Sequence, residues 1–493
     1  MCPRMSLSSK PDNDSLGSVG GNAGEAAASD GLASELQQLR QRIDLLPGSR
    51  AAGDDLKVLA DDLSGESDRV VSQLVGVALP LPHDLHALQQ IAVETLVATA
   101  RACSGATREG RSGFLSGFRR DDEVVARGLA LLVEAYEICC LAGCSPPYGF
   151  WLLAHGLFHS ACPSGVSAGE PERHNSAVAS YKRLLAINTL QPEGFTSTEL
   201  QQAYALLDEM ACMATVGVAA GEAAQSNFWI DYAQDTPPVP IVRREPPPVD
   251  GLGFFSAVPL GHHLTTLLDS LGEQEPDENA NAWDVGVDAV RLSLYRRLRE
   301  RWAMPPRREQ ARRRSEYSVQ VCIGLNPIWR RLSDPASAGR LAEWTVQNES
   351  PGGYAIMRLS GVADTLTSGM PIALRKNTDQ PWSICVVRWV RSETPDQLEL
   401  GLQLVSLAGI PVRIAFRTGA SAAGPVRALV LPPLEAVRRH QAILAPLGTY
   451  TSRRFVLLHE GARLYVAQGR LLSLDMQTTS VELFQFEVDP YPI

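Results

Sequence analysis

Two groups of polar residues in the middle of the chain have types and spacings suited to binding chemistry. The first is the arginine cluster at 307–314, which reads Arg-Arg-Glu-Gln-Ala-Arg-Arg-Arg. The second has the pattern N-x-S-x-x-G and consists of Asn348, Ser350 and Gly353. Guanidinium planes make paired hydrogen bonds to phosphate oxygens or to a guanine edge, and they also stack on bases. The amide and the hydroxyl offer compact donors and acceptors to a base edge, and the glycine permits a close backbone approach.

Both groups also have a plainer structural explanation. A turn after a strand, in which the Asn and Ser side chains bond their own backbone, accounts for N-x-S-x-x-G. A solvated helix face accounts for a run of arginines. The order and the spacing of the two groups, within a segment that is rich in predicted strands, favour the binding interpretation.

The elements that must position these residues are short strands. From Tyr317 onward the apolar residues alternate with a period of two, which predicts strands separated by turns. Six strands are predicted around the two polar groups: 317–323, 341–348, 353–359, 370–374, 383–391 and 398–405. They predict a closed antiparallel barrel over 305–410, because closure removes exposed sheet edges. A further small β module packed on it is predicted over 411–493, with strands at 412–417, 426–431, 442–444, 453–459, 464–474 and 481–488.

The first half of the chain is predicted to be all-α, so the expected class is an α+β multidomain protein. Residues 1–31 are rich in Ser, Gly, Asp and Ala and predict a disordered tail. Residues 32–235 predict a helical domain, since apolar residues recur there at helical spacing. Helices are expected at 32–46, 54–75, 84–103, 120–143, 147–161, 174–190 and 197–217. Paired helices of this length resemble a tetratricopeptide-type array, although no 34-residue period is present.

Two details of this half predict local structure. Thr196 and Glu199 have the spacing of a capping box at the start of a helix. Residues 236–304 predict a connecting segment, in which the proline-rich stretch 236–248 favours an extended chain. A helix from about Asp284 to Trp302 follows, and it places the arginine cluster on a short tether before the barrel.

A possible metal site lies in the helical half. His155 and His159 are four residues apart on one helix face, and two imidazoles with two thiolates could form a tetrahedral zinc site. The nearby thiols are Cys139, Cys140, Cys144 and Cys162. However, neither a Cys-x-x-Cys pair nor a glutamate after His155 is present, so no zinc-finger or metalloprotease motif is met. Cysteines packed in a helical core are the commoner arrangement.

Bulk composition excludes some classes of function. The net charge of −10 argues against broad nucleic-acid binding, which usually goes with a basic excess, even though nine arginines fall between Arg296 and Arg314. The nine cysteines follow no regular disulfide framework, which indicates a reducing compartment. No apolar run approaches the ~20 residues that span a bilayer, and no signal peptide is recognisable. We therefore expect a soluble, cytoplasmic protein.

The arginine cluster, the barrel pattern and N-x-S-x-x-G together resemble the PilZ family of cyclic di-GMP receptors. The likeness covers about residues 305–410 and includes a late strand pair, Ile384–Val390 and Leu400–Val405. The resemblance implies a bacterial, non-enzymatic protein of second-messenger signalling that binds cyclic di-GMP and has no cofactor. It also implies which residues bind the nucleotide: Arg308, Arg312, Arg313, Arg314, Asn348, Ser350 and Gly353.

The arginine half departs from the family pattern at one position. PilZ domains carry R-x-x-x-R shortly before the first strand. Aligned on the entry to that strand, the first arginine is Arg312 and the second position holds Glu316, whose carboxylate would repel phosphate. Alternatively, Arg308-x-x-x-Arg312 supplies the spacing four residues earlier, or Arg313 and Arg314 substitute.

Three functional hypotheses follow. In the first, cyclic di-GMP closes the arginine tether over the barrel and repositions the helical region, which contacts an unidentified protein partner. In the second, Glu316 makes the PilZ domain degenerate, and the chain is a protein-interaction scaffold that binds no nucleotide. In the third, the helical domain is a metal-binding or enzymatic unit around His155 and His159.

Overall fold

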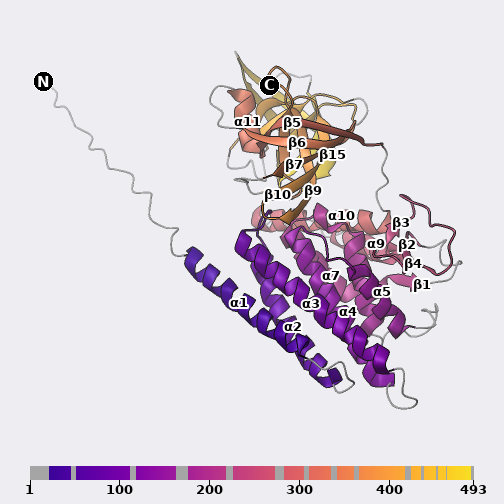
Figure 1. Cartoon of the computed structure of the whole chain (residues 1–493). Coiled ribbons are helices and arrows are strands. Elements are labelled where there is room, and N and C mark those ends of the chain that lie inside the picture. The colour runs from indigo at the N-terminus through magenta and orange to yellow at the C-terminus, as the bar shows by residue number, and fades with distance from the viewer. Residues whose placement is uncertain are drawn as a thin grey trace.

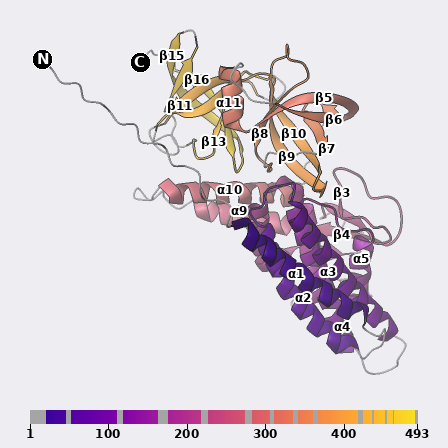
Figure 2. The same ribbon diagram turned by 60° about the vertical axis from the view of Figure 1, so that its left-hand side comes forward.

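The computed structural model arranges the chain as a helical region below two β-barrels, with a layer of two helices between them (Figures 1 and 2). The structure describes residues 21–45, 52–110, 118–162, 176–217, 226–272, 282–304, 310–334, 341–359, 366–416, 424–434, 438–450, 454–461 and 463–489. None of the described helices is both long and apolar enough to cross a bilayer.

The helical region is held together by one continuous apolar core. Its helices are α1 (Gly21–Asp44), α2 (Ala52–Leu74), α3 (His83–Gly110), α4 (Phe118–Ala142), α5 (Phe150–Ala161), α6 (Ser176–Thr189) and α7 (Ser197–Met210). Each contributes an apolar stripe, and residues such as Leu36, Leu96, Leu132 and Tyr181 are completely buried. The helices range from 12 to 28 residues, so they do not form repeats of one size.

The ends of this region differ from the sequence-based expectation. Helix α1 begins at Gly21, whereas the helical region was expected to begin at Leu32. Residues 25–29 are mainly alanine, which has the highest helix propensity, and this explains the earlier start. The last helix was expected to reach Gly217 but ends at Met210, and a short strand, β1 (Thr215–Gly217), follows a single 3₁₀ turn.

The capping box at the start of α7 is confirmed. The Thr196 hydroxyl accepts a bond from the Glu199 amide at 3.3 Å, and the Glu199 carboxylate accepts one from the Thr196 amide at 2.9 Å. Glu199 is almost completely buried, and its carboxylate also forms an ion pair with Arg297. The cap therefore ties the start of α7 to a helix almost 100 residues later.

The predicted connecting segment packs as part of the helical region. It contains β3 (Val239–Pro240), β4 (Leu252–Ser256), α9 (Val258–Gly272) and α10 (Ala282–Ala303), and β2 (Phe228–Asp231) comes just before it, in the stretch that was expected to be helical. The strands form a sheet in the order β1-β4-β2-β3. Leu264, Leu298 and Trp302 are fully buried in the same core as α1–α7. The Trp302 indole donates to the Ala186 carbonyl at 3.1 Å, so the end of α10 is anchored to α6.

The first barrel is a closed sheet of six antiparallel strands, as the sequence predicted. Its strands are β5 (Arg313–Ile323), β6 (Ala342–Ser350), β7 (Gly353–Leu359), β8 (Pro371–Arg375), β9 (Ser383–Thr394) and β10 (Gln397–Ser406). They pair in the order β10-β7-β6-β5-β8-β9. Alternate residues fill the interior, among them Val319, Trp344 and Leu400. A short helix, α11 (Leu325–Ser333), separates β5 from β6.

The second β module is also a closed six-stranded barrel, and it shares a core with the first. Its strands are β11 (Ile410–Ala415), β12 (Val426–Leu431), β13 (Ala442–Pro446), β14 (Arg454–Glu460), β15 (Leu464–Gln477) and β16 (Val481–Val488). They pair in the order β11-β12-β13-β16-β15-β14. Ile384 and Val386 of the first barrel lie in one apolar cluster with Leu429 and Leu444 of the second.

Several polar contacts join the helical region to the first barrel. Ser145 donates from its amide and from its hydroxyl to the Glu393 carboxylate at 3.1 and 2.7 Å. The Ser392 amide donates to the Gly143 carbonyl at 2.9 Å. Beside these polar contacts, Leu79 packs against both the core of the helical region and the core of the first barrel, so this interface is mixed.

The β7–β10 pairing leads to a stability prediction for Gly353. A Cβ atom at this position would lie 1.9 Å from the carbonyl oxygen of Leu402, which is backbone and cannot rotate away. We expect Gly353→Ala to lower the stability of the first barrel by ~2 kcal/mol or more, measured by denaturation with tryptophan fluorescence. The control Gly65→Ala lies inside α2, where a Cβ meets nothing within 4 Å, and should be neutral or stabilising. Equal stability of the two variants would contradict this reading of the register.

Candidate ligand-binding site

The barrel half of the candidate site is the hairpin between β6 and β7. Ser350 pairs with Gly353 at its tip, and Asn348 pairs with Ala355. The Ser350 hydroxyl donates to the Gly353 carbonyl at 3.4 Å, which is the local turn contact that the alternative explanation expected. The close backbone approach at Gly353 is to Leu402 of β10. The glycine therefore already has a role in strand pairing, whatever else it contacts.

The arginine half lies against this hairpin. In the β5–β6 ladder Arg313 faces Glu349 and Arg314 faces Asn348. Arg312, just before β5, donates from Nη1 to the Asn348 Oδ1 atom at 3.0 Å. All three arginines are exposed, so their guanidinium groups remain accessible to a ligand.

Six of the seven predicted site residues are thus brought to one end of the first barrel. They are Arg312, Arg313, Arg314, Asn348, Ser350 and Gly353. The seventh, Arg308, lies outside the described residues. The arginine that contacts Asn348 is therefore Arg312, which belongs to the C-terminal part of the arginine cluster.

Glu316 lies in an irregularity of the strand pairing. Between the pairs Arg314–Asn348 and Tyr317–Val346, two residues of β5 face a single residue of β6, which is a β-bulge. Glu316 is one of the two bulged residues and is exposed. The bulge places an exposed carboxylate two residues after Arg314 in the strand.

A second carboxylate, which the sequence interpretation did not single out, lies inside the motif. Glu349 accepts hydrogen bonds from the Tyr317 hydroxyl at 2.7 Å and from the Ser315 hydroxyl at 2.9 Å. These two bonds hold the pKa of Glu349 below its usual range, so the carboxylate is ionised at neutral pH. The Lys376 ammonium group lies 4.4 Å from the centre of the Tyr317 ring. The cross-strand pairing of β5 and β6, once inferred, would have pointed to Glu349.

The histidine pair of the helical region is engaged in the core. The Nδ1 atom of His155 lies 2.9 Å from the Tyr181 hydroxyl, and its Nε2 atom lies 3.2 Å from the Thr236 carbonyl oxygen. Burial lowers the pKa of His155 to about 4, so the ring is neutral and donates from Nε2. His159 packs edge-on against the Tyr232 ring. Both nitrogens of His155 are occupied, and the described residues contain no group of three or more His, Cys, Asp or Glu placed to hold a metal ion.

Comparison with known families matches all three parts of the chain. Residues 25–220 match the N-terminal domain of the cyclic-di-GMP receptor FimW, and residues 331–411 match its middle PilZ domain. Residues 412–489 match the FimW C-terminal beta-barrel domain. The PilZ match begins after β5, which nevertheless completes the first barrel.

A curated relative agrees with these matches. It is the cyclic-di-GMP receptor FimW of Pseudomonas aeruginosa (strain PAO1), which is 30% identical over 131 residues. The aligned part is 26% of this chain and 22% of the relative, so the chain matches only about a fifth of the relative's length. The three domain matches follow the order helical region, first barrel, second barrel, and the chain therefore belongs to the FimW family of PilZ-domain proteins.

Proposed function

We propose that this protein is a non-enzymatic receptor for cyclic di-GMP, which binds at the end of the first barrel between the arginines at the start of β5 and the β6–β7 hairpin. The contact between Arg312 and Asn348 carries the proposal, because it joins the arginine half to the N-x-S-x-x-G half. Exposed guanidinium groups next to a small amide suit a ligand that offers both phosphates and guanine edges. The relative's description as a cyclic-di-GMP receptor supports the same ligand.

The proposed output is a movement of the helical region relative to the barrels. Arg312 follows Trp302 by ten residues, and Trp302 is fully buried in the helical core. A ligand that draws Arg312 and its neighbours inward therefore pulls on a short connection to α10. The polar contacts of the helical region, such as Ser145 with Glu393, can exchange with water at low cost when that region shifts. The exposed surface of the helical region would then present itself differently to a protein partner.

Removal of Arg312 tests the ligand site. We expect Arg312→Ala to weaken cyclic di-GMP binding by roughly tenfold or more, because a charge-assisted hydrogen-bond donor is lost. Isothermal titration calorimetry of the full chain measures this. Arg470→Ala is the matched control, since Arg470 pairs with Glu487 in the second barrel and should leave affinity unchanged. If Arg312→Ala bound as tightly as the parent, the site assignment would be wrong; if the parent bound no nucleotide, the receptor function would be wrong.

Removal of the Glu349 charge is expected to strengthen cyclic di-GMP binding, whereas removal of Arg312 is expected to weaken it. The Glu349 carboxylate is ionised next to the residues proposed to hold phosphates, and a unit charge a few ångströms away in water contributes about 1 kcal/mol. Glu349→Gln keeps an acceptor for Tyr317 and Ser315 while it removes the charge. We therefore expect cyclic di-GMP affinity to rise roughly fivefold at neutral pH, measured by the same calorimetry. A fall in affinity would instead mean that the charge itself helps to organise the site.

A second candidate function, a protein-interaction scaffold without nucleotide binding, is favoured by the exposed carboxylate of Glu316 in the bulge. The substitution Glu316→Arg distinguishes the two functions. For a receptor we expect the parent to bind cyclic di-GMP and Glu316→Arg to bind it a few-fold more tightly, because repulsion becomes attraction. Binding by Glu316→Arg alone, with none by the parent, would favour the scaffold.

A further inference from the structure

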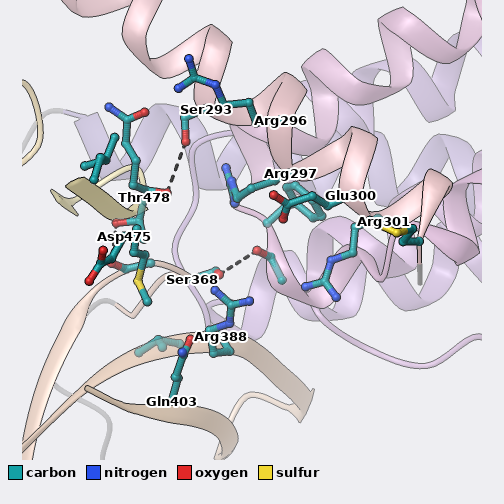
Figure 3. Close-up of a pocket in the computed structure, with 18 residues that line it drawn as sticks. Ser293, Arg296, Arg297, Glu300, Arg301, Ser368, Arg388, Gln403, Asp475 and Thr478 are labelled. Atoms are coloured by element: carbon teal, nitrogen blue, oxygen red, sulfur yellow. Dashed lines mark hydrogen bonds between the residues drawn. The ribbon is translucent and has the colours of Figure 1, made fainter. Parts of the chain in front are cut away.

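A cavity of about 690 Å³ lies where the helical region meets both barrels (Figure 3). Its wall comes from α10 on one side, from β9 and β10 of the first barrel on another, and from the end of β15 in the second barrel. Ligand pockets for small molecules commonly have volumes of roughly 300–1,000 Å³. The cavity is therefore large enough for a phosphorylated small molecule.

Three guanidinium groups from two domains converge on this cavity. Arg297 and Arg301 are one turn apart on α10, so they share a helix face. Arg388 projects from β9 on the opposite wall, and Figure 3 shows its guanidinium group directed toward the α10 pair. Arg296 also lines the cavity, but in the same view it points away from the other three.

The positive charge of the cavity is only partly balanced. Four arginines line it, against two carboxylates, Glu300 and Asp475. Arg297 forms an ion pair with Glu199, whereas Arg301 donates to a neutral oxygen, Oε1 of Gln191, at 2.7 Å. Within the described part of the chain, Arg388 makes no hydrogen bond or ion pair. Arg388 is exposed, so its guanidinium donors are open to water and to a ligand that enters the cavity.

Without an anion in the cavity, the closeness of Arg297, Arg301 and Arg388 is electrostatically unfavourable. Burial lowers the pKa of Arg297 and of Arg301 to about 10 each, and repulsion from Arg388 is the next cause for both. Desolvation by the surrounding protein also lowers the pKa of Arg388, although part of its side chain is exposed to water. The three groups still carry a positive charge at neutral pH, so the like charges face one another across the cavity. An anion between them would remove that repulsion and satisfy the open donors.

The geometry points to a second anion site, in which Arg297, Arg301 and Arg388 bind a phosphate-bearing ligand between the helical region and the first barrel. It goes beyond the receptor function, because it uses neither Arg312 nor Asn348. The two sites are neighbours, since Gln403 lines the cavity and pairs with Gly353 in the β7–β10 ladder. A ligand held from both walls would fasten α10 to β9.

Pyrophosphate is the probe, titrated into the full chain in phosphate-free and sulfate-free buffer. We expect calorimetric binding by the parent and a rise in its unfolding temperature. Arg388→Gln should weaken that binding by roughly tenfold or more. Arg391→Gln is the matched control: it lies on the same strand, loses the same charge and also breaks a contact with the helical region, its 3.0 Å pair with Glu193, but it does not line the cavity. Its affinity for pyrophosphate should match that of the parent.

A second readout separates a binding arginine from a structural one. Without anion, Arg388→Gln should unfold at the same temperature as the parent or higher, because it removes repulsion and breaks no described ion pair. A lower unfolding temperature would mean that Arg388 stabilises the fold, and would overturn the proposal. Arg301→Gln provides an independent variant, with the same expected loss of pyrophosphate binding.

Asn348→Ala distinguishes this site from the receptor site. We expect this variant to keep pyrophosphate binding, whether or not the parent binds cyclic di-GMP. If the variant also binds cyclic di-GMP in an Arg388-dependent manner, the ligand of the cavity is a phosphodiester; if it binds pyrophosphate alone, the ligand carries a terminal phosphate. No binding of pyrophosphate by the parent, equal binding by Arg388→Gln, or loss of binding in Asn348→Ala would each overturn the second site.

Discussion

The antiparallel pairing of β5 with β6 is the constraint on which the candidate site depends. It sets Arg314 opposite Asn348 and Arg313 opposite Glu349, although these residues are far apart in the sequence. A shift of one residue would move every side chain of β5 to the other face of the sheet and separate the two halves of the site. The bonds from Ser315 and Tyr317 to Glu349 add side-chain contacts to this register. Since β5 begins ten residues after α10 ends, the same pairing limits how far the helical region lies from the site.

The strands of both barrels could be predicted because their signal is local. Alternating apolar residues bounded by turn formers predicted Gly353–Leu359, Val426–Leu431 and Val481–Val488 with the bounds that the structure has. The closeness of the arginines to Asn348 followed from the family resemblance. The bulge at Glu316 was not predictable, because the residues around it alternate normally and only pairing with β6 displays the extra residue.

Features that join distant segments were beyond the reach of sequence reasoning. The proline-rich stretch indicated a connector, yet the segment that contains it packs into the helical core through α9, α10 and a small sheet. Arg388 belongs to an ordinary amphipathic strand pattern, and nothing local relates it to Arg297 or Arg301. Glu349 likewise occupies an unspecified position of its motif. In each case tertiary packing determines which residue is the partner, and the neighbouring residues in the sequence do not indicate that partner.

The shared core of the two barrels has a mechanical consequence. Because Ile384 and Val386 lie in one apolar cluster with Leu429 and Leu444, tilting one barrel on the other would expose closely packed surface to water. The movement proposed above is therefore expected at the interface between the helical region and the first barrel, and the two barrels are expected to move together. A small rotation at that interface would displace the far ends of α1–α4 most, because those ends lie many helical turns away from it (Figure 2). In that movement the second barrel would add mass and rigidity to the body against which the helical region turns.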